Sequence, residues 1–143
     1  MIIIRGEFCI IETNRPSDNT AIRKQEAPFV MIKVFIVDDH TLFRQGLIEI
    51  FKNFKDIKVV GEASSKEEFL SVYRRAKADI ILMDISLPDG NGIEIMRDIL
   101  KENPSQRFIV LSMYDDDKNV YDAFYSGASG YFTKTKNFSE LVN

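Results

Sequence analysis

The stretch KVFIVDDHTLF, residues 33–43, joins an apolar run to two adjacent aspartates, Asp38 and Asp39. The β-branched and aromatic residues before Asp38 are typical of a buried strand. Two like charges at the end of such a strand repel each other, and burial adds a desolvation cost. We therefore expect this strand end to belong to a site that requires negative charge.

Apolar runs like this one recur along the chain and alternate with segments of helical periodicity. The runs are VFIV (34–37), IKVV (57–60), IILM (80–83), FIVL (108–111) and GYFT (130–133). Between them, apolar residues recur at intervals of three and four, as on one face of a helix. Strands and helices that alternate five times form a parallel sheet with helices on both faces. The sequence thus predicts an α/β fold with three layers, αβα.

Polar residues mark the expected helix ends. Ser65 and Glu68 fit a capping box at the start of the second helix. Asp115 or Asp116 suits the start of the fourth helix, where a carboxylate also favours the helix dipole. Gly127 falls where that helix should stop.

Residues 1–30 depart from this pattern. Their polar part, ETNRPSDNTAIRKQEAP (12–28), is typical of a linker. We interpret residues 1–30 as an N-terminal extension, disordered or not native, and residues 31–143 as one folded domain. The fifth helix should begin near Asn137, which leaves about two turns before Asn143. We therefore expect this last helix to be truncated.

The composition is that of an ordinary globular protein, with 45% hydrophobic and 29% charged residues among 143. A net charge of −3 disfavours a nucleic-acid-binding surface within the chain. The single histidine, His40, excludes any site that needs two, and the single cysteine excludes an internal disulfide. No apolar run approaches the roughly 18 residues of a membrane span. We expect a cytoplasmic protein without membrane contact.

Chemically active residues follow four of the five expected strands. They are Asp38 and Asp39, Asp84, Ser112 and Lys134. In an open parallel sheet the functional crevice lies at the carboxyl ends of the strands, so these side chains should converge. Three carboxylates without a thiolate suit Mg²⁺, which prefers oxygen ligands. One carboxylate could then attack a phosphoryl group, while the lysine and the hydroxyl neutralise its oxygens.

Four motifs now identify a family. FIVDDH (35–40), ILMDISLPDGNGIEIM (81–96), LSM (111–113) and GASGYFTK (127–134) resemble the receiver (CheY-like) domain of bacterial two-component response regulators. The resemblance covers residues 31–143. It implies a flavodoxin-like (βα)5 fold with a five-stranded parallel sheet in the order 2-1-3-4-5.

The resemblance also implies a role for each acid at the strand ends. Asp84 is the expected phosphoacceptor. Asp39 is an expected direct ligand of Mg²⁺, with Mn²⁺ as a substitute, and Asp38 is expected to hold metal-bound water. Asp84 and the backbone carbonyl of Ser86 complete the expected metal site.

The remaining expected site residues act on the phosphoryl group or report its presence. By resemblance, Ser112 and Lys134 contact the phosphoryl oxygens, and Ser112 and Tyr131 form a conformational switch. Met113, after Ser112, is bulkier than the small residue common in the family, and Thr135 stands where many receivers have a proline. His40 is expected to be a helix-start residue rather than a ligand.

DDHTLFRQGL (38–47) further resembles the NarL/FixJ/LuxR-type subfamily, whose members carry a C-terminal helix-turn-helix domain. The implied protein is a signalling switch rather than a turnover enzyme, although it assists its own phosphorylation and dephosphorylation. Its implied partners are a sensor histidine kinase and, on phosphorylation, a second copy of itself. DNA would be bound only through an output domain that this chain lacks.

Three alternatives remain open at this level. A flavin or nucleotide-binding protein of this fold needs a phosphate loop after the first strand, where this chain has Asp38 and Asp39. An aspartate-nucleophile phosphatase commonly has a second acid two residues after the nucleophile, where this chain has Ser86. A degenerate receiver that only scaffolds a partner would not need the intact site.

Overall fold

The computed structural model describes residues 30–138 and Leu141. The predictions for residues 1–29, and for the rest of a fifth helix around Leu141, lie outside the described residues. No helix in the described part of the chain is both long enough and apolar enough to cross a membrane.

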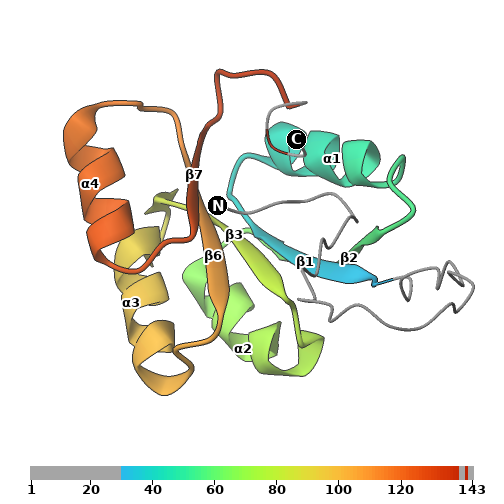
Figure 1. Cartoon of the computed structure of the whole chain (residues 1–143), viewed down its shortest axis with the longest axis horizontal. Helices are drawn as coiled ribbons and strands as arrows, with labels where there is room; N and C mark the ends of the chain where they lie inside the picture. The colour runs from blue at the N-terminus through green and yellow to red at the C-terminus, as the bar shows by residue number, and fades with distance from the viewer. Residues whose placement is uncertain (1–29, 139–140, 142–143) are drawn as a thin grey trace, which may run out of the picture.

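Five parallel strands form the central sheet (Figure 1). They are β1 (Ile32–Val37), β2 (Ile57–Ala63), β3 (Ile80–Asp84), β6 (Arg107–Ser112) and β7 (Gly130–Thr133). Their order is β2-β1-β3-β6-β7, and every neighbouring pair is parallel. Since β6 and β7 are the fourth and fifth strands of this sheet, the predicted order 2-1-3-4-5 is confirmed.

Helices cover both faces of the sheet, which confirms the three layers (Figure 1). The helices are α1 (Thr41–Phe51), α2 (Lys66–Ala76), α3 (Gly92–Glu102) and α4 (Asp117–Tyr125). Apolar residues of α2, α3 and α4 pack with one set of strand residues, which includes Phe35, Ile81 and Phe108. Leu47 and Phe51 of α1 pack with the alternate set on the other face.

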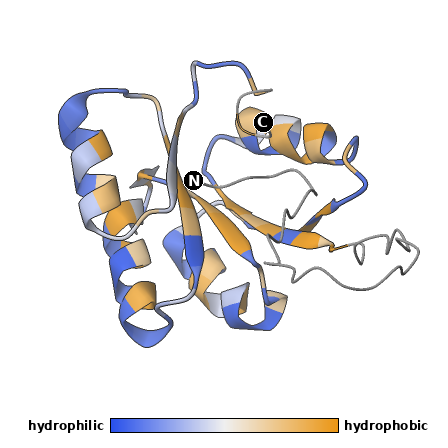
Figure 2. Ribbon diagram, in the orientation of Figure 1, coloured by the Kyte–Doolittle hydropathy of each residue, from blue (hydrophilic) through white to orange (hydrophobic). Residues whose placement is uncertain are grey.

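The two-sided burial explains why the central strands carry no polar alternation. All five residues of β3 are buried, and adjacent residues such as Ile81 and Leu82 belong to opposite cores. The hydropathy colouring shows apolar strands between helices with polar outer faces (Figure 2). Phe138 and Leu141 add to the core on the α1 side.

Two of the predicted helix caps are present. In one of them, the second hydrogen bond of the predicted capping box goes to a different residue. The Ser65 side chain accepts a hydrogen bond from the Glu68 backbone N–H (3.1 Å). The Glu68 carboxylate, however, binds the N–H and hydroxyl of Ser64 rather than the N–H of Ser65. Asp116 caps α4 by accepting from the backbone N–H of Asn119 (3.0 Å).

A small antiparallel hairpin, β4 (Ser86–Leu87) and β5 (Gly90–Asn91), follows β3. Its two-residue strands are too short to carry a periodic sequence signal. The hairpin lies immediately after Asp84 and leads into α3. It therefore shapes one side of the sheet edge at which the strands end.

Candidate functional site

The predicted residues meet at the carboxyl edge of the sheet. Asp84 is the last residue of β3 and Ser112 is the last residue of β6. Asp38 directly follows β1, and Lys134 directly follows β7. The strands are parallel and adjacent, so these four positions share one edge.

Lys134 joins two of the carboxylates. Its Nζ atom lies 2.7 Å from Asp38 Oδ2 and 2.9 Å from Asp84 Oδ2, and only 3% of the lysine side chain is exposed. Neither oxygen has a further hydrogen-bond partner among the described residues. The Phe43 ring, 5.1 Å from Nζ, covers the ammonium. A buried cation thus offsets part of the repulsion within the aspartate cluster.

The surroundings of Asp84 disfavour the charged form of its carboxyl group. Burial raises the pKa of its carboxyl group to about 6, and the nearby Asp38 also raises that pKa. The Lys134 ammonium and the backbone N–H of Ser86 oppose this rise. One ammonium therefore does not fully compensate for the burial of this carboxylate, and a further cation would favour its charged form.

The backbone of Asp84 is fixed by the turn that follows it. The Ser86 N–H lies 3.3 Å from Asp84 Oδ1. The Gly92 N–H donates to the carbonyl of Ile85 (2.8 Å), and any Cβ atom at Gly92 would overlap the carbonyl oxygen of Asp84. Glycine at position 92 therefore allows α3 to begin directly against the end of β3.

Asp38 is held by groups from two neighbouring elements. Its backbone N–H donates to Ala63 at the end of β2 (3.0 Å), and its Oδ1 accepts from the His40 backbone N–H (2.8 Å). The Arg44 guanidinium donates to the Asp38 carbonyl and to the Glu62 carboxylate (2.7 Å). Arg44 was not predicted from the sequence, although its position one turn into α1 was an available signal.

Asp39 and His40 form the outer part of the cluster. About 36% of the Asp39 side chain is exposed, whereas Asp38 is fully buried. His40 precedes α1, as predicted for a helix-start residue. Its ring also enters the cluster, because Nδ1 lies 3.2 Å from Asp39 Oδ1, 3.3 Å from Asp38 Oδ1 and 3.3 Å from Lys134 Nζ. The sequence did not predict this placement.

Ser112 and Tyr131 are linked through the backbone of one residue, Tyr114. The Ser112 hydroxyl accepts from the Tyr114 N–H (3.0 Å), and the Tyr131 hydroxyl donates to the Tyr114 carbonyl (2.6 Å). The Lys134 N–H also donates to the Ser112 carbonyl (2.7 Å). The two predicted switch residues are thus joined through the loop that contains Tyr114. Ser112 is also bonded to the backbone of Lys134.

The cluster has the donor set of a divalent-cation site. Asp38, Asp39, His40 and Asp84 each offer one ligand atom, and these atoms all lie within 4.8 Å of one another. Asp38 and Asp84 each have a buried Oδ2 atom with no hydrogen-bond partner among the described residues, and the Lys134 ammonium pairs with both of these oxygens. Hard oxygen donors without a thiolate fit Mg²⁺ or Mn²⁺.

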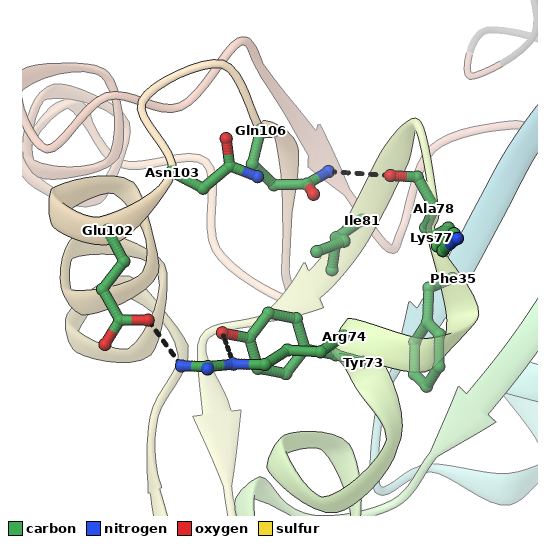
Figure 3. Close-up of a pocket in the computed structure, with 9 residues that line it drawn as sticks. All are labelled: Phe35, Tyr73, Arg74, Lys77, Ala78, Ile81, Glu102, Asn103 and Gln106. Atoms are coloured by element: carbon green, nitrogen blue, oxygen red, sulfur yellow. Dashed lines mark hydrogen bonds and ion pairs between the residues drawn. The ribbon is translucent and has the colours of Figure 1, made fainter.

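A separate groove of about 440 Å³ lies at the opposite edge of the sheet, between α2 and α3 (Figure 3). Its walls carry an ion pair between Arg74 and Glu102 (2.6 Å) and a hydrogen bond from the Gln106 side chain to the Ala78 carbonyl (3.2 Å). The polar groups of this groove are therefore paired with one another. In the acidic cluster, by contrast, one ammonium only partly compensates for the buried carboxylates, so the cluster is the candidate functional site.

Comparison with known proteins gives one consistent result. The sequence pattern of the response regulator receiver domain family matches residues 34–143. The chain is 42% identical over 112 residues to the DNA-binding transcriptional activator DevR/DosR of Mycobacterium tuberculosis. That match covers 78% of this chain and 52% of the relative, so the chain spans about half the length of the curated relatives it matches.

Solved structures agree with the sequence comparison. A LuxR-family two-component response regulator from an Aurantimonas species is 34% identical with a TM-score of 0.73, covering 78% of this chain and 80% of that one. The signal receiver domain of the putative response regulator NarL from M. tuberculosis is 27% identical with a TM-score of 0.73. That match covers 79% of this chain and 91% of the other.

Proposed function

Because this chain belongs to the response regulator receiver domain family, we propose that Asp84 is the residue on which it accepts a phosphoryl group. The observation that carries the proposal is the shared ion pair of Lys134 with Asp38 and Asp84. It sets the buried carboxylate of Asp84 beside an ammonium group and a second acid, at the sheet edge where ligands of such folds bind.

Asp84 acts as the nucleophile in this proposal. A carboxylate oxygen attacks the phosphorus atom of a phosphohistidine, the P–N bond breaks, and the histidine leaves with the bonding electrons. The product is an aspartyl phosphate, which water later hydrolyses to phosphate and the free carboxylate. The domain thereby assists both its own phosphorylation and its dephosphorylation, as a switch rather than as a turnover enzyme.

Mg²⁺, with Mn²⁺ as a substitute, is the proposed cofactor. Asp39, Asp84 and the Ser86 carbonyl would hold it, with Asp38 acting through water. When bound, such an ion neutralises charge that develops on the transferred phosphoryl oxygens. The two buried carboxylate oxygens without a hydrogen-bond partner and the clustered donors support this assignment.

Lys134 and Ser112 are the proposed phosphoryl contacts. The Lys134 ammonium already lies 2.9 Å from an Asp84 oxygen, so a phosphoryl group on Asp84 would come within its reach. Drawing the Ser112 hydroxyl toward that group would break its hydrogen bond from Tyr114. Release of Tyr114 would in turn free Tyr131, which makes these two residues the proposed switch.

The proposed partners follow from the family. A sensor histidine kinase would supply the phosphoryl group, and phosphorylation would promote a homodimer. The relative DevR/DosR is a DNA-binding transcriptional activator. We propose that this chain likewise controls transcription through an output domain beyond the portion that matches.

Incubation with Mg²⁺ and acetyl phosphate, followed by intact-protein mass spectrometry, tests the central step. We expect one phosphoryl adduct in the wild type and none in Asp84→Asn. Removal of Mg²⁺ with a chelator should also abolish the adduct. An undiminished adduct in Asp84→Asn would exclude Asp84 as the acceptor.

A further inference from the structure

We propose that His40 is a metal ligand for ions that favour nitrogen, such as Zn²⁺ and Co²⁺, in the same cluster. In this arrangement the imidazole Nδ1 binds the ion together with carboxylates of the cluster, Asp39 first among them. The inference rests on the proposed cation site, and it adds a second class of metal ion that the site would bind. It also assigns a role to the only histidine of the chain.

The distances suit ligands of one ion. Two ligands in neighbouring positions around an ion, with bonds of about 2.1 Å, lie about 3.0–3.4 Å apart. His40 Nδ1 lies 3.2 Å from Asp39 Oδ1 and 3.3 Å from Asp38 Oδ1, which is within that span. Its separation of 3.9 Å from Asp84 Oδ2 requires a wider angle at the same ion.

Without a metal ion, Nδ1 cannot make favourable contacts with the ammonium and with the carboxylates at the same time. If Nδ1 carries a proton it donates to the aspartates but opposes the Lys134 ammonium, 3.3 Å away. If Nδ1 is bare it accepts from the ammonium but opposes the carboxylate lone pairs. A metal ion removes this conflict, because it accepts lone pairs from the imidazole and from the carboxylates alike.

The charges of the cluster point to a divalent ion. Three carboxylates face one buried ammonium, which leaves an excess of two negative charges when all three are ionised. Asp38 and Asp84 each have one buried oxygen without a hydrogen-bond partner in the described structure, and that ammonium is the nearest positive charge to both. Asp38 and His40 both follow β1, but Asp84 ends β3, so the buried oxygen of Asp84 indicates a cation independently of the loop that carries His40.

Metal ions differ in their affinity for imidazole nitrogen. It is a good ligand for Zn²⁺, Co²⁺, Ni²⁺ and Cu²⁺, whereas Mg²⁺ prefers oxygen and keeps several waters. His40 would therefore add affinity for the first class and little for Mg²⁺. An ion held through His40 would compete with Mg²⁺ and make phosphorylation sensitive to transition metals.

Paramagnetic NMR of the Co²⁺-loaded chain tests the ligand directly. A Cys9→Ser background removes the one thiolate, and with a single histidine in the chain any imidazole signal is assignable. We expect one exchangeable imidazole N–H resonance shifted far outside the diamagnetic range, absent in His40→Gln. A Co²⁺ spectrum without this resonance in the histidine-containing chain would overturn the proposal.

Calorimetric titration provides the second measurement. The ratio of Zn²⁺ affinity to Mg²⁺ affinity should fall about tenfold or more in His40→Gln. Leu42→Gln, at a neighbouring position of α1 that is 89% exposed, is the matched control and should leave that ratio unchanged. An unchanged ratio in His40→Gln would contradict the proposal.

The two proposals fail in different ways. If His40 is not a ligand, Co²⁺ gives no shifted imidazole resonance while the wild type still forms the Mg²⁺-dependent adduct on Asp84. If the phosphoacceptor proposal fails, the adduct is absent whatever the NMR spectrum shows. The wild-type NMR measurement does not depend on the folding of any His40 variant.

Discussion

Asp89 caps helix α2 from outside that helix: its Oδ1 accepts a hydrogen bond from the Lys66 backbone N–H at 2.7 Å, and its Oδ2 accepts one from the next N–H at 2.9 Å. Asp89 lies in the turn between β4 and β5, 23 residues from Lys66 in sequence. The hairpin that follows Asp84 is thus fastened to the N-terminus of α2, where a carboxylate is favoured.

Asp89→Asn should lower the stability of the domain at pH 7. The two backbone N–H groups hold the pKa of Asp89 below its usual 3.8, so its stabilising effect is present above that value and is lost as pH falls through the folded-state pKa. Urea denaturation at pH 7 and pH 3 should show a midpoint difference that shrinks at the lower pH. Asp115→Asn, at an exposed loop position, is the control, and an equal loss there would contradict the cap.

Asp84→Asn should stabilise the metal-free domain. Burial raises the Asp84 pKa from 3.8 to about 6, so its contribution to stability is full below pH 3.8 and is lost as pH rises through 6. At pH 7 with a chelator we expect a gain of about 1–2 kcal/mol in the free energy of unfolding. The gain should vanish near pH 4, and a destabilised variant at pH 7 would refute the expectation.

Gly92→Ala should displace the end of β3. The new Cβ would overlap the Asp84 carbonyl oxygen, so we expect a loss of about 2 kcal/mol or more in stability and a weaker phosphoryl adduct. Gly46→Ala is the matched control, because nothing lies within 4 Å of its added Cβ and the site is inside α1. That control should gain about 0.5–1 kcal/mol by thermal or urea unfolding.

Lys134→Met should leave two buried carboxylates without their cation. Removal of one member of a buried ion pair costs about 3–5 kcal/mol, so the unfolding midpoint should fall in chelator. Asp84→Asn in the same chain should recover part of that loss, since one buried charge is then gone. Lys136→Met, at an exposed position, should change the midpoint little.

Much of the fold was predictable because its signals are local. The apolar runs located all five strands of the sheet, and the residues after them located Asp38, Asp84 and Lys134 at one edge. The strand order came from the family resemblance, because periodicity does not fix which strands are neighbours. Ser65 and Asp116 were found from cap chemistry that acts within four residues.

The features that were missed depend on tertiary structure. Asp89 is a residue type that suits a cap or a turn, but its reach to α2, like that of Arg44 to Glu62, spans many residues of sequence, and no local pattern encodes those contacts. The hairpin β4–β5 is too short to show a period. The entry of the His40 ring into the cluster depends on a side-chain rotamer, which sequence spacing does not set.

Tyr114 has both of its backbone polar groups engaged, its N–H by Ser112 and its carbonyl by Tyr131. The first bond restrains the torsion φ of Tyr114 and the second restrains ψ, so the loop before α4 is clamped on both sides of one Cα atom. Loss of the first bond would free φ and, through the same residue, loosen the second bond. Tyr131→Phe would remove the second bond directly and would therefore release ψ without any phosphoryl group.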